Sequence, residues 1–294
     1  GFYEMNDVLN LSQIIMNLYS EQPGPIGVFD SGYGGLTILE DIRRQMPEYD
    51  YIYLGDNARA PYGTRSFEIV YEFTREAVLT LFERGCQLVI LACNTASAKA
   101  LRSIQQKDLP QIAPNRRVLG VIRPTVEALG HITRTGKIGI LGTTGTIQSC
   151  SYPLEIKKLY PEYEVFGEAC PMWVPLVENN EHRSPGADYF VRQYIDRLMM
   201  QCPDIDTVIL GCTHYPLLLD KIKTFLPEGV LPLPQGDLVA VSLKNYLYRH
   251  PEMERRCTKS STCRFLTTES PQRFSMAASL FLKENVNVSR IVLE

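Results

Sequence analysis

Short apolar runs of strand length alternate with stretches of helical periodicity along most of the chain. Five of these runs, at residues 25–30, 51–56, 88–92, 137–142 and 208–211, are each followed directly by Ser, Asn, Cys or Thr. Apolar positions then recur with the spacing of an amphipathic helix. This alternation predicts an α/β protein with mostly parallel, doubly wound sheets.

Two of these runs lead into similar peptides. Residues 89–95 read VILACNT, and residues 208–214 read VILGCTH. Each peptide places a cysteine, Cys93 or Cys212, directly after a predicted strand and before a predicted helix. Ligands of α/β proteins bind at this carboxyl end of the strands. The two thiols are therefore the first candidates for chemistry.

A second motif repeats in the same order. The strand and glycine turn that start near Ile26 are similar to those that start near Ile138, an offset of 138 − 26 = 112 residues, and the two cysteines are 212 − 93 = 119 residues apart. Nearly equal offsets predict a duplicated half-chain. We therefore expect two α/β domains related by an approximate twofold, with the active site in the crevice between them.

The chain ends and one internal segment carry further predictions. Residues 1–22 have apolar positions at helical spacing and predict an N-terminal helical extension that packs on the body of the protein, because a Gln-Pro-Gly-Pro peptide follows. We also expect a helix over residues 95–105, a loop over 110–115 and a last strand over 289–293.

Composition narrows the class of protein. The chain has 294 residues, of which 45% are hydrophobic and 21% charged, as in folded proteins with one or two ordinary domains. A net charge of −3 without a long basic run argues against nucleic-acid binding. The sequence has no apolar stretch of about 20 residues and no signal-peptide pattern, so we expect a cytoplasmic protein without membrane contact.

Cysteine usage favours reduced thiols. The chain has eight cysteines without a C-x-x-C pair and only four histidines, which fits neither a disulfide framework nor a zinc site, so no metal is expected. Six cysteines are typical of small buried side chains. They are Cys86, Cys150, Cys170, Cys202, Cys257 and Cys263. We expect three of the four histidines, His131, His182 and His250, at the surface.

Two thiols that face one ligand from opposite sides suit inversion at a carbon atom. One thiolate removes the α-proton, and the other thiol delivers a proton to the opposite face. Asp30 ends the first predicted strand and His214 follows Cys212 by two residues, so these side chains are candidates to assist proton transfer. Threonine hydroxyls and backbone amides can stabilise the carbanionic charge.

Four long peptides resemble those of the glutamate racemases in the aspartate/glutamate racemase family. The resemblance runs from about Pro25 to the C-terminus, and residues 143–146 and 175–178 fit it as well. The four peptides are DSGYGGLT at 30–37, GDNARAPYG at 55–63, ACNTA at 92–96 and GCTHYP at 211–216.

The resemblance implies an isomerase that interconverts L- and D-glutamate without a cofactor and supplies D-glutamate for peptidoglycan. It implies that Cys93 is the base for D-glutamate and that Cys212 is the base for L-glutamate. It further implies that Asp30 and His214 assist them, with Glu178 as a further catalytic candidate near Cys212.

The resemblance also implies the substrate contacts and the organisation of the chain. The implied contacts are Asp30, Ser31, Pro61, Tyr62, Gly63, Asn94, Thr95, Thr143, Thr146 and Thr213. The implied division is an extension at 1–22, a first domain of 23–117 plus 230–294, and a second domain of 118–229. Members of the family are commonly homodimers.

The chain departs from the family pattern at three places. Arg123 stands where we expect an acidic residue, which affects the electrostatics of the domain junction. Residues 234–236, which read Pro-Gln-Gly, differ from the acidic pattern that we expect in the C-terminal segment. The N-terminal extension is an addition, and some relatives use such a segment to bind a cell-wall precursor as activator. An activator of this kind is a hypothesis for this chain.

Three other functions remain open from the residues. The first is racemisation of aspartate or a related acid, because the motifs define the thiols better than the length of the substrate. The second is a cysteine hydrolase with Cys212 as nucleophile and His214 as base, which leaves Cys93 without a role. The third is a protein that binds an amino acid without catalysis.

Overall fold

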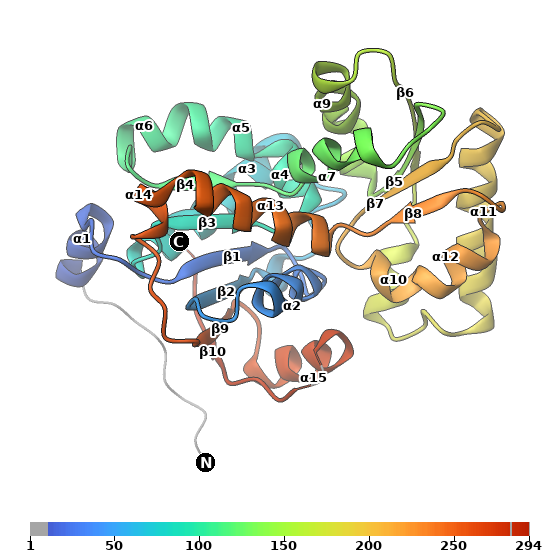
Figure 1. Ribbon diagram of the computed structural model, residues 1–294. Helices are drawn as coiled ribbons and strands as arrows, with labels where there is room; N and C mark the ends of the chain where they lie inside the picture. Colours follow the sequence, from blue (N-terminus) through green and yellow to red (C-terminus); the bar gives the residue numbers. More distant parts are fainter. Residues whose placement is uncertain (1–10, 283, 294) are drawn as a thin grey trace.

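The computed structural model describes residues 11–282 and 284–293 as an α/β protein with two sheets (Figure 1). All strand pairs within both sheets are parallel, which confirms the predicted class. Four strands, β1 (Ile26–Asp30), β2 (Tyr51–Gly55), β3 (Leu88–Leu91) and β7 (Thr207–Gly211), are buried along their whole length. Helices on both faces of a parallel sheet account for this burial.

The first sheet has six strands in the order β10-β9-β2-β1-β3-β4. The strands other than β1, β2 and β3 are β4 (Arg117–Leu119), β9 (Cys263–Thr267) and β10 (Val288–Arg290). The last two lie beside β2, so the C-terminal segment completes the sheet that the N-terminal segment begins (Figure 1). β10 is shorter than the predicted strand at 289–293.

The second sheet has four strands in the order β6-β5-β7-β8. Its other members are β5 (Lys137–Gly142), β6 (Glu164–Ala169) and β8 (Leu231–Leu233). This order repeats β2-β1-β3-β4 of the first sheet strand for strand. The first strand of each half, β1 or β5, precedes a turn. The third strand of each half, β3 or β7, precedes a cysteine, as a duplicated half-chain predicts.

Strand pairing locates the two points where the chain crosses between the sheets. Leu119 pairs with Ile90 in the first sheet, and Leu233 pairs with Ile209 in the second. The crossings therefore follow Leu119 and Leu233, somewhat later than the expected limits at 117/118 and 229/230. The reason is that each half ends in a short edge strand, β4 or β8, that the apolar pattern does not predict. The division into domains otherwise stays a prediction.

Helices connect the strands. In the first half they are α2 (Gly35–Gln45), α3 (Phe67–Glu83), α4 (Asn94–Lys99), α5 (Leu101–Ser103) and α6 (Leu109–Ile112). In the second half they are α7 (Ile122–Glu127), α8 (Thr144–Gln148), α9 (Ser151–Leu159), α10 (Trp173–Glu178), α11 (Pro185–Gln201) and α12 (Leu219–Phe225). The C-terminal segment adds α13 (Gly236–Arg249), α14 (Pro251–Glu254) and α15 (Pro271–Phe281).

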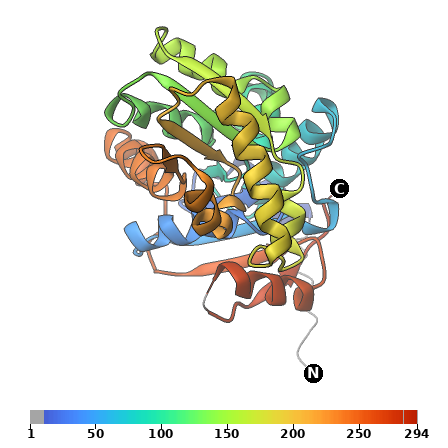
Figure 2. The ribbon, with the colours of Figure 1, turned by 90° about the vertical axis from the view of Figure 1, so that its right-hand side faces the viewer.

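Two long helices cover the sheets on different sides of the molecule. α11 packs on β5 and β6 and crosses the front of the view in Figure 2. α13 follows the second crossing and packs on α2 of the first half. One apolar core cluster includes residues from both halves, among them Val28, Trp173 and Tyr215. The two halves therefore share packed apolar surface.

The helix predicted over 95–105 is longer than expected. After α4 and α5 the chain continues as a π-helical turn over 104–108 and then as α6, so the loop expected at 110–115 begins only after Ile112. Pro110 lies in the first turn of α6, directly after the π-helical turn, where the regular α-helical hydrogen-bond pattern is already interrupted. Proline was therefore a poor marker of the helix end.

The N-terminal extension contains α1 (Leu11–Tyr19), which packs on α3. The prediction of a helix over 1–22 is confirmed for residues 11–19, and the helix ends at Tyr19. Residues 1–10 lie outside the described residues. The side chain of Gln87 donates to the carbonyls of Ser20 at 2.9 Å and Gln22 at 3.1 Å. These bonds tie the base of the extension to the body of the protein.

Candidate active site

A cavity of about 270 Å³ lies where the carboxyl ends of strands from both sheets meet. Asp30, Cys93, Thr143 and Cys212 follow or end β1, β3, β5 and β7, and all four line it. All the predicted site residues except Thr146 line this cavity. They are Asp30, Ser31, Pro61, Tyr62, Gly63, Cys93, Asn94, Thr95, Thr143, Glu178, Cys212, Thr213 and His214.

Cys93 precedes α4 and is buried. Its sulfur lies 3.3 Å from the Ser31 hydroxyl and accepts the N–H of Ala96 at 3.4 Å. Burial, followed by the negative charge of Asp30, raises the pKa of Cys93 to about 12, although the bonds to Ser31 and Ala96 act in the opposite direction. Cys93 is therefore a neutral thiol at physiological pH.

Asp30 is buried at the end of β1, and one of its oxygens accepts the N–H of Gly35 at 2.7 Å. Burial raises the pKa of this carboxyl group above its usual value, whereas nearby His214 lowers it. Asp30 thus lies within electrostatic range of both Cys93 and His214.

Cys212 belongs to a chain of three side chains. Its sulfur lies 3.9 Å from Nδ1 of His214, and Nε2 of the same ring lies 3.0 Å from a carboxylate oxygen of Glu178. Burial alone lowers the pKa of His214, but the bonds to Cys212 and Glu178 outweigh it and raise this pKa to about 10. His214 is therefore an imidazolium at neutral pH, next to a sulfur.

The glycine turn after β1 brings the two halves into contact. A Cβ added at Gly34 would lie 2.4 Å from the hydroxyl of Thr213 and 2.6 Å from Nδ1 of His214, so only glycine fits here. Thr37 also donates to the carbonyl of Thr213 at 3.3 Å. The turn therefore leaves room for Thr213 and His214 to pack against the first half.

Three threonines form a cluster between the halves. The hydroxyls of Thr95 and Thr143 are 3.0 Å apart, and Thr146 lies 3.3 Å from Thr95 and 3.2 Å from Thr143. Thr146 is buried and supports the other two hydroxyls without lining the cavity. Thr95 and Thr143 face the cavity and can donate to a ligand.

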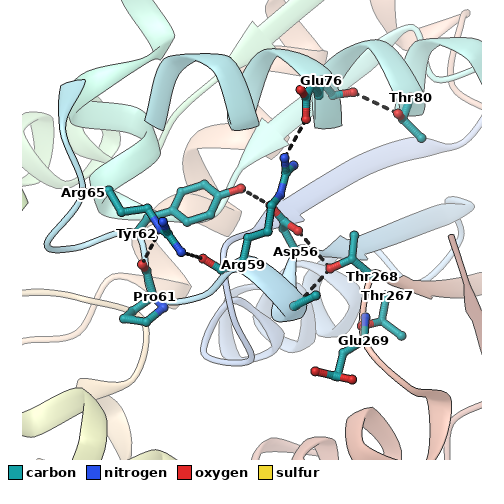
Figure 3. A network of polar contacts seen from close by, with 11 residues as sticks. Asp56, Arg59, Pro61, Tyr62, Arg65, Glu76, Thr80, Thr267, Thr268 and Glu269 are labelled. Carbon is teal, nitrogen blue, oxygen red and sulfur yellow. Dashed lines mark hydrogen bonds and ion pairs between the residues drawn. The ribbon is translucent and has the colours of Figure 1, made fainter. Parts of the chain in front are cut away.

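The loop that carries Pro61, Tyr62 and Gly63 is held by the buried carboxylate of Asp56 (Figure 3). Asp56 accepts the Tyr62 hydroxyl, Nε of Arg59 at 2.7 Å and the Thr268 hydroxyl at 2.9 Å. Because its hydroxyl already donates to Asp56, Tyr62 offers a ligand only its ring and its main chain.

Two arginines complete the support of this loop (Figure 3). Arg59 pairs with Glu76 of α3 at 2.8 Å, and Arg65 donates to the carbonyls of Arg59 and Pro61 at 2.8 and 3.1 Å. At its tip the carbonyl of Gly63 accepts the N–H of Gly145 in the second half at 2.6 Å. The loop thus spans from the first half to the second.

Further residues line the cavity that the sequence motifs did not predict. Thr64, Thr144, Cys170, Pro171, Val174 and Asn179 also line the cavity. Cys170 follows β6 directly, as Cys93 and Cys212 follow their strands, so the same position after a strand identifies it. Burial raises the pKa of this third thiol well above its usual value. Pro171 and Val174 give the cavity an apolar wall.

Residues 11–282 and 284–293 contain neither a metal-binding cluster nor a membrane-spanning helix. Within them the structure has no cluster of three or more His, Cys, Asp or Glu side chains that could hold a metal ion. Within the same residues, every helix is too short or too polar to cross a membrane.

Comparison with known proteins places the chain in a family. The model of the Asp/Glu/hydantoin racemase family matches residues 27–236. The chain belongs to this family. It is therefore an enzyme of the isomerase class, and the cavity lined by Cys93 and Cys212 is its candidate active site.

Named members of the family are similar over almost their whole length. A glutamate racemase of Roseobacter denitrificans is 39% identical over 274 residues, covering 90% of this chain and 98% of the relative. A glutamate racemase isoform of Bacillus anthracis, solved by crystallography, has a TM-score of 0.83 at 37% identity, with 92% of this chain and 98% of that chain covered.

A third relative was solved with ligands. The Escherichia coli glutamate racemase, in complex with L-glutamate and the activator UDP-MurNAc-Ala, has a TM-score of 0.70 at 25% identity. The comparison covers 92% of this chain and 98% of that chain.

The two thiols of this racemase have opposite electrostatic surroundings. Cys93 faces the carboxylate of Asp30, which disfavours a second negative charge. The sulfur of Cys212 instead lies 3.9 Å from the imidazolium of His214, a positive charge. Cys93 and Cys212 thus have neighbours of opposite charge in the same cavity.

This asymmetry predicts selective alkylation. At pH 7, iodoacetamide should modify Cys212 faster than Cys93, because His214 keeps its proton until the pH rises through about 10 whereas Cys93 stays protonated. His214→Gln should slow modification of Cys212, and His131→Gln, at an exposed position, should not. Peptide mass spectrometry measures both sites. Equal modification of Cys93 and Cys212 would contradict the assigned charges.

Proposed function

We propose that this chain interconverts L- and D-glutamate by a two-base mechanism that needs no cofactor, with Cys93 and Cys212 as the bases. The observation that carries the proposal is one cavity lined by two thiols from corresponding positions of the two halves. Its substrate is supported by the relatives, which are named glutamate racemases at 39% and 37% identity.

In the direction from L- to D-glutamate, the thiolate of Cys212 removes the α-proton and the thiol of Cys93 delivers its own proton to the opposite face. Cys212 leaves this step as a thiol and Cys93 as a thiolate, so the proton count is conserved. In the reverse direction the two roles exchange. The protonation states of the free enzyme, a thiol at Cys93 and an imidazolium beside Cys212, suit the first direction.

Neighbouring groups assist each base. His214, held by Glu178 at 3.0 Å, keeps a positive charge beside Cys212 and can receive or return a proton. Asp30 is buried near Cys93 and stabilises its protonated form. Removing an α-proton leaves carbanionic charge, which hydrogen-bond donors stabilise best when water is excluded.

The remaining residues of the cavity bind the substrate in this proposal. Side-chain donors surround the space, and the loop with Pro61, Tyr62 and Gly63 covers it. The proposed contacts are Asp30, Ser31, Pro61, Tyr62, Gly63, Asn94, Thr95, Thr143 and Thr213, with Thr146 acting through Thr95 and Thr143.

The cellular part of the proposal follows from the reaction. D-glutamate is a component of peptidoglycan, so the enzyme would act in the cytoplasm in cell-wall synthesis and cell shape. We further propose that the two domains, divided near the chain crossings, close on the substrate, and that the chain forms a homodimer.

Replacing each cysteine by serine tests the two-base proposal. Cys93→Ser and Cys212→Ser should each lower kcat for racemisation by about a hundredfold or more, because each removes a group that transfers a proton. Circular dichroism of L- and D-glutamate measures racemisation, and NMR in deuterated water measures exchange of the α-proton. Cys150→Ser, at an exposed thiol, is the matched control.

Each rival function has its own outcome in this experiment. A cysteine hydrolase would tolerate Cys93→Ser. A binding protein without catalysis would bind glutamate with no α-proton exchange in the wild type. An aspartate racemase would exchange the α-proton of aspartate faster than that of glutamate.

A cell-wall precursor activator is a further part of the proposal, supported by the activator in the complex of the Escherichia coli enzyme and by the N-terminal extension of this chain. Removing residues 1–19 leaves the contacts of Ser20 and Gln22 with Gln87 intact. We expect the truncated enzyme to keep its basal kcat and to lose activation by UDP-MurNAc-Ala. Activation equal to that of the full chain would exclude a role for the extension.

A further inference from the structure

The side chain of Gln235 lies beside the active site without lining the cavity. It directly precedes α13, at the second chain crossing, and is almost fully buried. Its amide contacts residues from both halves: Asn94, Thr125 and Tyr152. Asn94 directly follows Cys93 and lines the cavity, so Gln235 is connected to the active site through one side chain.

The direction of every hydrogen bond in this group follows from one backbone carbonyl. The Thr125 hydroxyl donates its only proton to the carbonyl of Val121 at 2.8 Å. Its oxygen must therefore accept from Gln235, whose Nε2 lies 3.0 Å away. This places the nitrogen of the Gln235 amide against Thr125. The same nitrogen lies 3.1 Å from Oδ1 of Asn94, so the two amides face each other with the Gln235 oxygen toward Nδ2 of Asn94.

The remaining directions follow in turn. Oε1 of Gln235 accepts from Nδ2 of Asn94 at 2.7 Å, which turns Oδ1 of Asn94 toward the Tyr152 hydroxyl at 2.6 Å. Burial raises the pKa of Tyr152 above its usual value, so Tyr152 keeps its proton and donates it to Asn94. Tyr152 accepts from Nε2 of Gln235 at 2.6 Å, which closes a ring of three side chains.

The ring fixes the amide of Asn94 in one orientation. Both the Oδ1 acceptor and one N–H of Nδ2 are used inside the ring, and the amide nitrogen carries a second N–H. Asn94 lines the cavity, so this second N–H is the group that it can offer to a substrate carboxylate or to developing negative charge.

We infer that Gln235 is a positioning residue of the racemase: it holds the Asn94 amide so that an N–H is presented to glutamate. This inference rests on the proposed function. An ionised acidic side chain at this position could accept hydrogen bonds but could not donate to Thr125 and Tyr152. Glutamine supplies the two N–H groups that set the direction of the ring in this chain.

Gln235→Met tests the inference, since methionine has a similar length and no hydrogen-bonding amide. Asn94 donates to the substrate in the bound complex as well as in the transition state. The variant should therefore raise KM about tenfold for both L- and D-glutamate and change kcat by less than about twofold. Gln201→Met, at an exposed amide, is the matched control. Loss of folded protein alone would lower the apparent kcat and leave KM unchanged, which would contradict the inference.

A double-mutant cycle tests whether Gln235 acts through Asn94. If it does, Asn94→Ala and the double variant should have the same kcat/KM and the same calorimetric affinity for D-glutamate, because the second change has nothing left to orient. Additive losses would overturn the inference. Tyr152→Phe removes one hydroxyl from the ring and gives a second route to the same comparison if Gln235→Met folds poorly.

The proposed function and this inference fail in different ways. A wild-type enzyme that does not racemise glutamate would refute the proposed function. A wild-type enzyme that racemises glutamate, with Gln235→Met and Tyr152→Phe both showing the wild-type KM, would refute the inference alone.

Discussion

The contact between Cys212 and His214 organises the chemistry of the cavity. A buried imidazolium persists there because a sulfur and the carboxylate of Glu178 lie on its two sides, which outweighs the cost of burial and raises the pKa of His214 to about 10. The same cavity holds Cys93 beside Asp30, where burial and negative charge keep the thiol protonated. Equivalent positions in the two halves thus have neighbours of opposite charge.

The two thiols can share one cavity only because the two halves of the chain approach closely. Gly34 leaves room for Thr213 and His214, the carbonyl of Gly63 accepts the N–H of Gly145, and Thr95 and Thr143 share a hydrogen bond. Each of these contacts joins one half to the other at the cavity. The separation of the sheets is therefore set by short polar contacts, and the shared apolar core supplies the packing behind them.

The sequence predicted the parts of this structure that depend on local pattern. Strands buried on both faces read as apolar runs, and position after such a strand identified Cys93 and Cys212; applied to β6, the same rule would also have found Cys170. The edge strands β4 and β8 have only three residues each, and β8 contains Pro232, which is atypical of a strand, so neither is recognised from its pattern. The ring around Gln235 joins residues as far apart as 141 positions, and no local pattern predicts such a contact.

The position of the two sulfurs around bound glutamate tests the two-base mechanism most directly. A crystal structure of the complex should place the Cα between Cys93 and Cys212, on opposite faces, with each sulfur within roughly 3.5 Å of it. Sulfurs on the same face of the Cα, or one sulfur in a pocket that does not hold the ligand, would contradict the mechanism.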